Sequence, residues 1–451
     1  MDVHYVENEN ITVAFFPETK RFFKVNKNAI LLINAIISGK EKEQILSDFN
    51  ISSEDCDIYY NNIYGGITKP TAIITEKSKK RILNRLVIHL TNDCNMRCKY
   101  CYANGGNYFS KRSILEKGMM DAIIDCFFKE FEIIEGIQFF GGEPLMNYPM
   151  LEYGCKQISK IATLRGYTVN FGIVTNGTLV NDTFINLVNK YNINVTVSYD
   201  GNPFVNDIMR IMQDGKGSSD IILRNAKELK KKTGQPTTIE VTYNQFHVDN
   251  SVDILDVINH ISSELPNTYI HLVPAGGDEK CDYSIKNLKI FSQSITQILQ
   301  RVKMKGENIP NYSLAQRIFW ALENRNNDIS KICDAGFGTM SVSIMGDVYP
   351  CFMFTDNPQL CYGNITNQNL FYSKQYAKIK EQIEMFSNKS KNLECQKCFI
   401  KSLCNGCLGL NAFHSGSPFE LSKDICQMFR DMTDQALLEY AELQYNTTRE
   451  G

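Results

Sequence analysis

Thr91-Asn-Asp-Cys94-Asn-Met-Arg-Cys98-Lys-Tyr-Cys101-Tyr102 carries three cysteines at the spacing CxxxCxxC, directly after the apolar segment 86–90. Three thiolates at this spacing can bind three irons of a cubane iron-sulfur cluster. The fourth iron then has no protein ligand and is open to chelation by a small molecule, whereas an electron-carrier cluster normally has four cysteines. The unfilled position indicates catalysis.

Strand and helix patterns alternate around this stretch, from residue 85 to about 305. Helices are predicted at 114–131, 150–164, 182–190, 219–232, 253–263 and 286–303. Strands are predicted near 86–90, 137–140, 169–175, 195–199, 238–243 and 269–273. Six βα units indicate an α/β fold with a parallel sheet, whose functional loops lie at the carboxyl ends of the strands. The cysteine stretch is the first of these loops.

The cysteine spacing, with the aromatic Tyr100 before the last cysteine, resembles the motif of the radical S-adenosylmethionine (SAM) family. The family's partial (β/α)6 TIM barrel matches the six predicted units. The resemblance implies that Cys94, Cys98 and Cys101 hold a catalytic 4Fe-4S cluster and that SAM chelates its open iron. One electron would cleave SAM to a 5'-deoxyadenosyl radical, which abstracts hydrogen from the substrate. A three-cysteine zinc site would need a fourth ligand nearby and would leave the barrel unexplained.

Four further loops carry residues that the family uses to bind SAM. After the second strand, the segment Gly141-Gly142-Glu143-Pro144 is similar to the family's GGEP, in which glycines permit close backbone approach and the carboxylate receives the SAM ammonium. By resemblance the other SAM-contact residues are Tyr100, Thr175, Asn176, Ser198, Asp200 and Arg210, with Ser198 and Arg210 on the SAM carboxylate and Asp200 near the ribose.

A second group of cysteines lies near the end of the chain and is similar to the SPASM extension, which carries two more 4Fe-4S clusters. The family's interleaved pattern implies an outer cluster on Cys395, Cys398, Cys404 and Cys426, and an inner cluster on Cys333, Cys351 and Cys407. Three 4Fe-4S clusters are therefore expected in all. Two structural zinc knuckles are the alternative that similar spacings permit.

The inner set has three ligands where some relatives have four, because their extra cysteine is absent near Thr339. An open iron at this position would bind a peptide thiolate, which suits thioether chemistry. Cys361 is the alternative fourth ligand. The last pair, Cys404 and Cys407, is spaced CxxC, whereas the relatives more frequently have CxxxC.

The chain divides into three predicted domains. Residues 1–80 combine three short strands with three helical patterns, and resemble the winged-helix-like domain that recognises the leader of a peptide substrate. A structural cap is the alternative. Residues 85–310 form the radical SAM barrel. Residues 330–451 form the cysteine-rich SPASM domain with a C-terminal helix, which we expect to be held by metal rather than by a large core.

Bulk composition limits the location and the partners. The net charge of -2 gives no reason to expect nucleic acid, and no apolar run is long enough to span a membrane. Fifteen cysteines without a secretory signal indicate a reducing, cytoplasmic location and metal ligation rather than disulfides. The family resemblance further implies an electron donor such as flavodoxin or ferredoxin.

The residue after Cys351 bears on which class of reaction the protein catalyses. Sulfatase-maturing relatives typically have an aspartate there, but this chain has Phe352, so the expected general base is missing. Maturation of a ribosomally made peptide is the leading hypothesis, and the motifs look most like those of thioether-forming maturases. Three alternatives remain: a carbon-carbon cross-linking maturase, a non-catalytic iron-sulfur protein that binds peptide or transfers electrons, and a zinc-stabilised interaction module.

Overall fold

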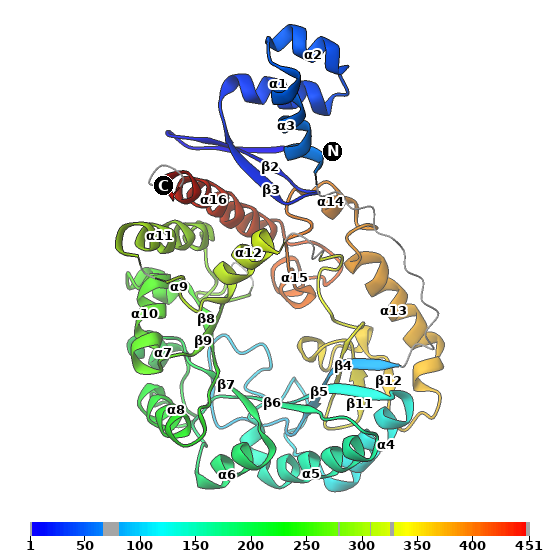
Figure 1. Cartoon of the computed structure of the whole chain (residues 1–451). Helices are drawn as coiled ribbons and strands as arrows, with labels where there is room; N and C mark the ends of the chain where they lie inside the picture. Colours follow the sequence, from blue (N-terminus) through cyan, green and yellow to red (C-terminus); the bar gives the residue numbers. More distant parts are fainter. Residues whose placement is uncertain (1, 66–80, 278–279, 307, 325–328, 448–451) are drawn as a thin grey trace.

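The computed structural model describes residues 2–65, 81–277, 280–306, 308–324 and 329–447, with the side chains of 444–447 left aside. The predicted end of the first domain at residue 80 lies outside the described residues, as does the end of the third domain at 448–451. Between these gaps the chain forms a small N-terminal unit, a ring of strands and helices, and a C-terminal part that contacts both (Figure 1).

Six parallel strands follow one another in chain order, as predicted. They are β4 (Ile82–His89), β5 (Ile133–Phe140), β6 (Asn170–Thr175), β7 (Asn194–Ser198), β8 (Thr238–Tyr243) and β9 (Tyr269–Pro274). The sheet continues on the far side of β4 with three strands from the C-terminal part, β10 (Thr339–Val342), β11 (Asp347–Tyr349) and β12 (Gly363–Asn364). In the described part of the chain β9 and β12 do not pair, so the barrel is partial.

Helices cover the outside of this sheet. They are α4 (Lys117–Glu130), α5 (Tyr148–Leu164), α6 (Asp182–Tyr191), α7 (Pro203–Met209), α8 (Ser219–Thr233), α9 (Gln245–Asp249), α10 (Ile254–Glu264), α11 (Lys289–Lys305) and α12 (Ser313–Glu323). The sequence pattern did not predict α7, α9 and α12. The first strand was predicted to start at residue 86 instead of 82, because polar Asn84 and Arg85 interrupt the apolar run. Arg85 nevertheless pairs with both neighbouring strands.

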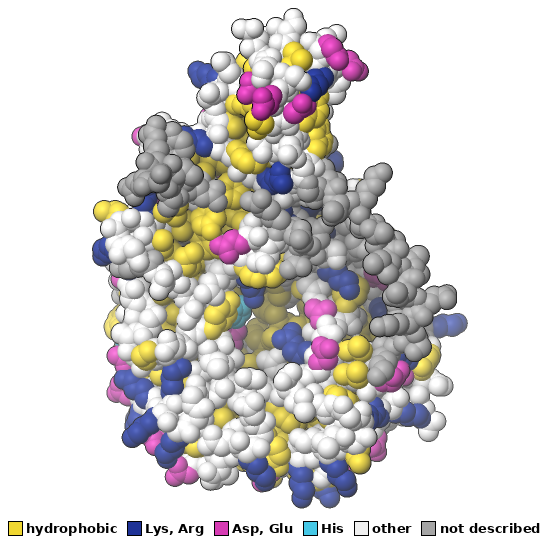
Figure 2. Space-filling view, in the orientation of Figure 1, with side chains coloured by type: hydrophobic (Ala, Val, Ile, Leu, Met, Phe, Trp, Pro, Cys, Tyr) yellow, Lys and Arg dark blue, Asp and Glu magenta, His cyan; other side chains and the backbone are white. Residues whose placement is uncertain are grey.

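Strand β8 shows how the barrel separates its two sides. Ile239, Val241 and Tyr243 are buried in the core beneath the helices. The residues between them, Glu240 and Thr242, are partly exposed and face the opposite side, the interior of the ring. Figure 2 shows a hollow in the middle of this face with charged side chains around it.

The N-terminal unit has three antiparallel strands, β1 (His4–Glu7), β2 (Thr12–Phe16) and β3 (Arg21–Val25), followed by α1 (Lys27–Ile37), α2 (Lys42–Phe49) and α3 (Ser53–Tyr64). Both faces of β2 are covered: Phe15 belongs to the main core and Phe16 to a second core under the three helices. One correction concerns α3, which is capped by Ser52 rather than by Ser53, because the Ser52 side chain accepts from the Asp55 amide.

The C-terminal part buries more apolar residues than we predicted for a domain held by metal rather than by a large core. Its helices are α13 (Lys374–Ser387), α14 (Leu393–Gln396), α15 (Leu408–Ser415) and the 25-residue α16 (Lys423–Thr447). Helix α16 packs along α11 and beneath the N-terminal sheet, and its Met432 and Leu437 are buried in the main core. Among the described residues, none of the helices combines the length and apolarity needed to cross a membrane.

Candidate active site

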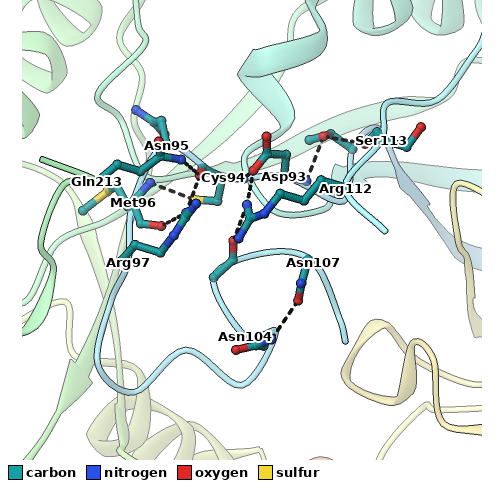
Figure 3. Close-up of polar contacts among 12 residues, drawn as sticks. Asp93, Cys94, Asn95, Met96, Arg97, Asn104, Asn107, Arg112, Ser113 and Gln213 are labelled. Carbon is teal, nitrogen blue, oxygen red and sulfur yellow. Dashed lines mark hydrogen bonds and ion pairs between the residues drawn. The ribbon is translucent and has the colours of Figure 1, made fainter. Parts of the chain in front are cut away.

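The CxxxCxxC loop leaves the carboxyl end of β4 and is held by backbone and side-chain hydrogen bonds. The Arg97 guanidinium donates to the Cys94 carbonyl at 2.6 Å, and Gln213 donates to the same oxygen at 2.6 Å (Figure 3). The backbone of the loop also pairs with residues 209–213 after α7, where the Arg97 amide donates to the Ile211 carbonyl at 2.7 Å. The loop is therefore positioned by the protein itself.

The three thiols of this loop are close enough to influence one another. Burial raises the pKa of the Cys94 thiol to about 12, and the neighbouring Cys98 and Cys101 add to the rise. Burial likewise raises the pKa of Cys98, to about 11. Buried thiolates need compensating positive charge, which the irons of a cluster supply.

A single metal ion fits the loop less well than a cluster. In the part of the chain that the structure describes, three His, Cys, Asp or Glu side chains do not converge closely enough to hold one ion. A cubane places each cysteine on a different iron, so its ligands stand farther apart than those of one zinc ion. The arrangement thus suits a 4Fe-4S cluster.

The two glycines after β5 are required by the cysteine loop. A Cβ on Gly141 would lie 2.4 Å from the Thr91 carbonyl oxygen, and one on Gly142 would lie 2.0 Å from that of Asp93. The two loops pair through their main chains, since the Gly142 amide donates to Thr91 O at 2.9 Å. The close backbone approach expected of these glycines is therefore made to the cluster loop.

Glu143 connects three loops beneath the site. Its buried carboxylate accepts hydrogen bonds from the Thr175 hydroxyl at 2.6 Å, the Asn176 amide at 2.7 Å and the Leu145 amide at 3.0 Å. Burial raises the pKa of this carboxyl, while these donors lower it. The Asn176 side chain donates to Asn95 at 2.9 Å. Glu143, Thr175 and Asn176 are thus brought together beside the cluster loop.

Asp200, Tyr100 and Arg210 form a second buried group next to Cys98. The Tyr100 hydroxyl donates to Asp200 at 2.8 Å and accepts from Arg210 Nη1 at 3.0 Å. Within the described residues the buried Nε of Arg210 has no hydrogen-bond partner. A buried guanidinium with an unused donor fits an anionic ligand, and the carboxylate of SAM has the required charge.

Ser198 ends β7, and its neighbour across the sheet is a residue that the sequence reasoning missed. Ser198 pairs in register with Glu240 of β8, which pairs in turn with His271 of β9. Burial raises the pKa of the Glu240 carboxyl, and the nearby Arg210 lowers it. The alternation of apolar and polar residues in β8 was the signal that a carboxylate points into the barrel.

The cysteines near the end of the chain lie in two groups. Around the Cys404 thiol lie Cys395, Cys398 and Cys426, and burial raises the pKa of Cys404 to about 12, with these neighbours adding to the rise.

The inner set lies apart from them. Cys407 and Cys333 neighbour the Cys351 thiol, whose pKa burial also raises to about 12. Cys361 has other surroundings: its sulfur lies 3.8 Å from the Gly363 carbonyl oxygen, and its charged neighbour is Asp347.

Phe352 is part of an apolar contact where the sulfatase-maturing relatives would have an acid. Its ring lies 4.6 Å from that of Phe140, and the adjacent Met353 sulfur lies 3.8 Å from the Cys407 sulfur. The remaining cysteines differ in burial. Cys56 and Cys155 are fully buried, as expected for packing residues, while Cys126 and Cys281 are partly exposed.

Comparison with known proteins identifies two domains. Residues 88–261 match the model of the radical SAM superfamily, and residues 333–399 match that of SPASM, an iron-sulfur cluster-binding domain. This chain therefore contains a radical SAM domain and a SPASM domain. Iron-sulfur clusters and SAM are therefore its cofactors.

Three relatives place this radical SAM enzyme among known proteins. The radical SAM cyclopropyl synthase TigE of Paramaledivibacter caminithermalis is 23% identical over 79% of this chain and 76% of TigE. The structure of anSMEcpe with bound SAM and Cp18Cys peptide has a TM-score of 0.63 at 18% identity, over 80% of this chain and 99% of that one. SuiB of Streptococcus suis, bound to its precursor peptide SuiA, has a TM-score of 0.53 at 15% identity, over 94% and 100%. The likeness to the two structures shows the fold.

Proposed function

We propose that this enzyme matures a ribosomally made precursor peptide, by abstracting hydrogen from a peptide residue and forming an intramolecular cross-link. The observation that supports this most directly is the pair of auxiliary cysteine sets beside the SAM site, in a fold shared with the peptide-bound structures of SuiB and anSMEcpe. When bound, SAM and its cluster supply the 5'-deoxyadenosyl radical. Cys94, Cys98 and Cys101 hold that cluster, and the two auxiliary sets bring the total to three.

The residues around the cluster loop divide the binding of SAM between them. Glu143 receives the ammonium group, because its carboxylate keeps acceptor capacity beyond its three present donors. Arg210 and Ser198 bind the carboxylate of SAM, and Asp200, held by Tyr100, lies near the ribose. Gly141 and Gly142 keep the loops close enough for these contacts, and Thr175 and Asn176 complete the pocket.

The bond formed is most consistent with a cysteine thioether. Cys333, Cys351 and Cys407 supply three ligands to the inner cluster. Cys361 instead lies next to residues of β11, among them Asp347 and Tyr349, and we do not assign it to this cluster. A cubane with three cysteines keeps one coordination position for an outside ligand, and a peptide thiolate is suited to it. A carbon-carbon bond is the second candidate, favoured by the similarity to TigE, a cyclopropyl synthase.

Co-expression tests this proposal. The enzyme is produced with each short peptide encoded beside its gene, and the peptides are analysed by mass spectrometry. A peptide that loses two hydrogen atoms only in the presence of the active enzyme is the expected result, with the enzyme carrying alanine at Cys94, Cys98 and Cys101 as control. Alkylation then separates the two bonds, because a thioether blocks the cysteine and a carbon-carbon bond leaves it reactive. Unchanged masses for every peptide would contradict the proposal.

Residues 1–80 are proposed as the leader-binding domain, in the described part of which β3 has a free edge. Arg21 of β3 donates to the Asn61 carbonyl at 2.7 Å, so α3 runs beside this strand. Ile58 of α3 is 53% exposed. An extended leader would pair with the strand edge and cover Ile58.

Ile58→Asp is therefore expected to weaken leader binding roughly 10-fold, since a charge would replace an apolar anchor. Fluorescence anisotropy with the labelled leader of the co-expressed peptide measures the affinity. Leu31→Asp is the matched control, because Leu31 of α1 is similarly exposed, at 60%. If wild type and Ile58→Asp bind the leader with equal affinity, the N-terminal domain acts as a structural cap rather than as a leader-binding domain.

A further inference from the structure

Lys389 is a buried charged residue in the segment between α13 and α14. Its side chain is only 6% exposed. The ammonium donates to the Lys401 carbonyl at 2.7 Å and also to the Cys404 carbonyl. Both carbonyls belong to the loop that carries Cys404 of the outer set and continues to Cys407 of the inner set. The side chain thus holds this loop from within.

The main chain of Lys389 is tied to the other auxiliary site. Its amide donates to the Ser330 carbonyl at 3.0 Å, and two residues earlier Ser387 accepts from the Ile332 amide at 2.8 Å. This pairing runs into Cys333, the first ligand of the inner set. Lys389 therefore lies where the segments that carry the two cysteine sets meet.

The buried ammonium lies at the outer set, because it donates to the main-chain carbonyl of Cys404, one of the four cysteines of that set. Attraction between charges is several-fold stronger in a partly dry interior than in water. Lys397, adjacent to Cys398, is exposed to solvent, and water screens its charge.

Around the inner set the cations are placed differently. Arg85 and Arg317, the cations near Cys351 and Cys407, are both exposed to solvent, which screens their charge. The ammonium of Lys389 is buried, and it lies against the Cys404 carbonyl of the outer set. A cluster with four thiolates carries net negative charge, and one-electron reduction adds another.

We propose that Lys389 raises the reduction potential of the outer cluster. The inference rests on the proposed pair of auxiliary clusters. Reduction of the outer cluster by a one-electron reductant such as dithionite would add one negative charge, which the nearby ammonium of Lys389 would stabilise. Lys389 is a positioning and tuning residue and touches no substrate.

Redox titration monitored by electron paramagnetic resonance tests this role without any peptide. The protein carries alanine at Cys94, Cys98 and Cys101, so that only the auxiliary signals remain, and Cys426→Ser identifies the outer one. In Lys389→Met the equilibrium constant for reduction of the outer cluster should fall about tenfold, which corresponds to a reduction potential lower by ~59 mV for one electron. The inner signal should change less. Lys389→Arg, which keeps the charge, should stay near the parent potential, and Lys397→Met should shift it less than twofold.

Several results would overturn the proposal. One is an unchanged potential in Lys389→Met, and another is an arginine variant that falls as far as the methionine variant. If Lys389→Met assembles no outer cluster, Lys389→Gln repeats the comparison with a neutral donor. Loss of the cluster from both neutral variants would make Lys389 a purely structural residue. Iron analysis showing a single cluster in the wild-type protein would instead refute the auxiliary sites themselves, before any titration.

Discussion

Replacing Cys94, Cys98 and Cys101 together with alanine is expected to abolish reductive SAM cleavage, with a loss of at least about 1,000-fold. The physical reason is that the loop then lacks every thiolate that holds the catalytic cluster, while the surrounding hydrogen bonds from Arg97 and Gln213 go to main-chain carbonyls and survive. The fold should therefore remain. Production of 5'-deoxyadenosine with dithionite as reductant measures the effect.

A matched control replaces three cysteines that belong neither to the SAM loop nor to the two auxiliary sets. Alanine at Cys56, Cys126 and Cys155 should leave the rate of SAM cleavage within severalfold of wild type. The triple variant of the loop should still contain the iron of the auxiliary clusters, about two thirds of the wild-type content if three clusters are present. Continued 5'-deoxyadenosine production by that variant would refute the role of the loop.

Arg210→Met is expected to weaken SAM binding by at least about 100-fold. The substitution removes a buried cation beside Asp200 and Tyr100. Truncating one partner of a buried, hydrogen-bonded charge pair across a binding interface typically costs about 2–5 kcal/mol of binding free energy. It also removes the unused Nε donor that fits the SAM carboxylate. Every 1.4 kcal/mol corresponds to about tenfold in affinity. Equilibrium dialysis with labelled SAM measures the dissociation constant.

Stability has to be separated from binding in this variant, because uncompensated Asp200 also destabilises the fold. Thermal unfolding without SAM reports the first effect and the dialysis reports the second. Arg224→Met is the control, since Arg224 is exposed on α8 and its loss should change neither quantity appreciably. Reduced stability with unchanged SAM affinity would assign Arg210 a structural role only.

The sequence predicted the barrel strands and the SAM loop well, for a physical reason. Most barrel strands carry apolar residues at alternate positions, which pack under the helices, and a cluster loop needs cysteines at short distances along the chain. Both patterns can be recognised in the sequence alone, because they involve residues that are close together along the chain. Strand β4 was misjudged only at its start, where Asn84 and Arg85 are polar but remain in the sheet, since neighbouring strands on both sides satisfy the backbone.

Contacts between distant segments were beyond that reasoning. Glu240 and Ser198 meet because two strands share a register. Lys389 reaches Cys404 because the loops that carry the auxiliary cysteines cross. A lone glutamate in a strand and a lone lysine in a loop carry no local pattern that distinguishes them from ordinary surface residues.

By itself, then, the sequence determined the chemistry of this protein: the three-cysteine loop, the GGEP segment and the two spaced sets of auxiliary cysteines. Only the tertiary structure decided why Gly141 and Gly142 are glycines, which donors surround Glu143, and where Cys361 lies. It also showed that α16 and strand β10 join the C-terminal part to the barrel core. Ligand identity depends on residue type and spacing along the chain, whereas burial, register and charge proximity depend on which segments the fold brings together.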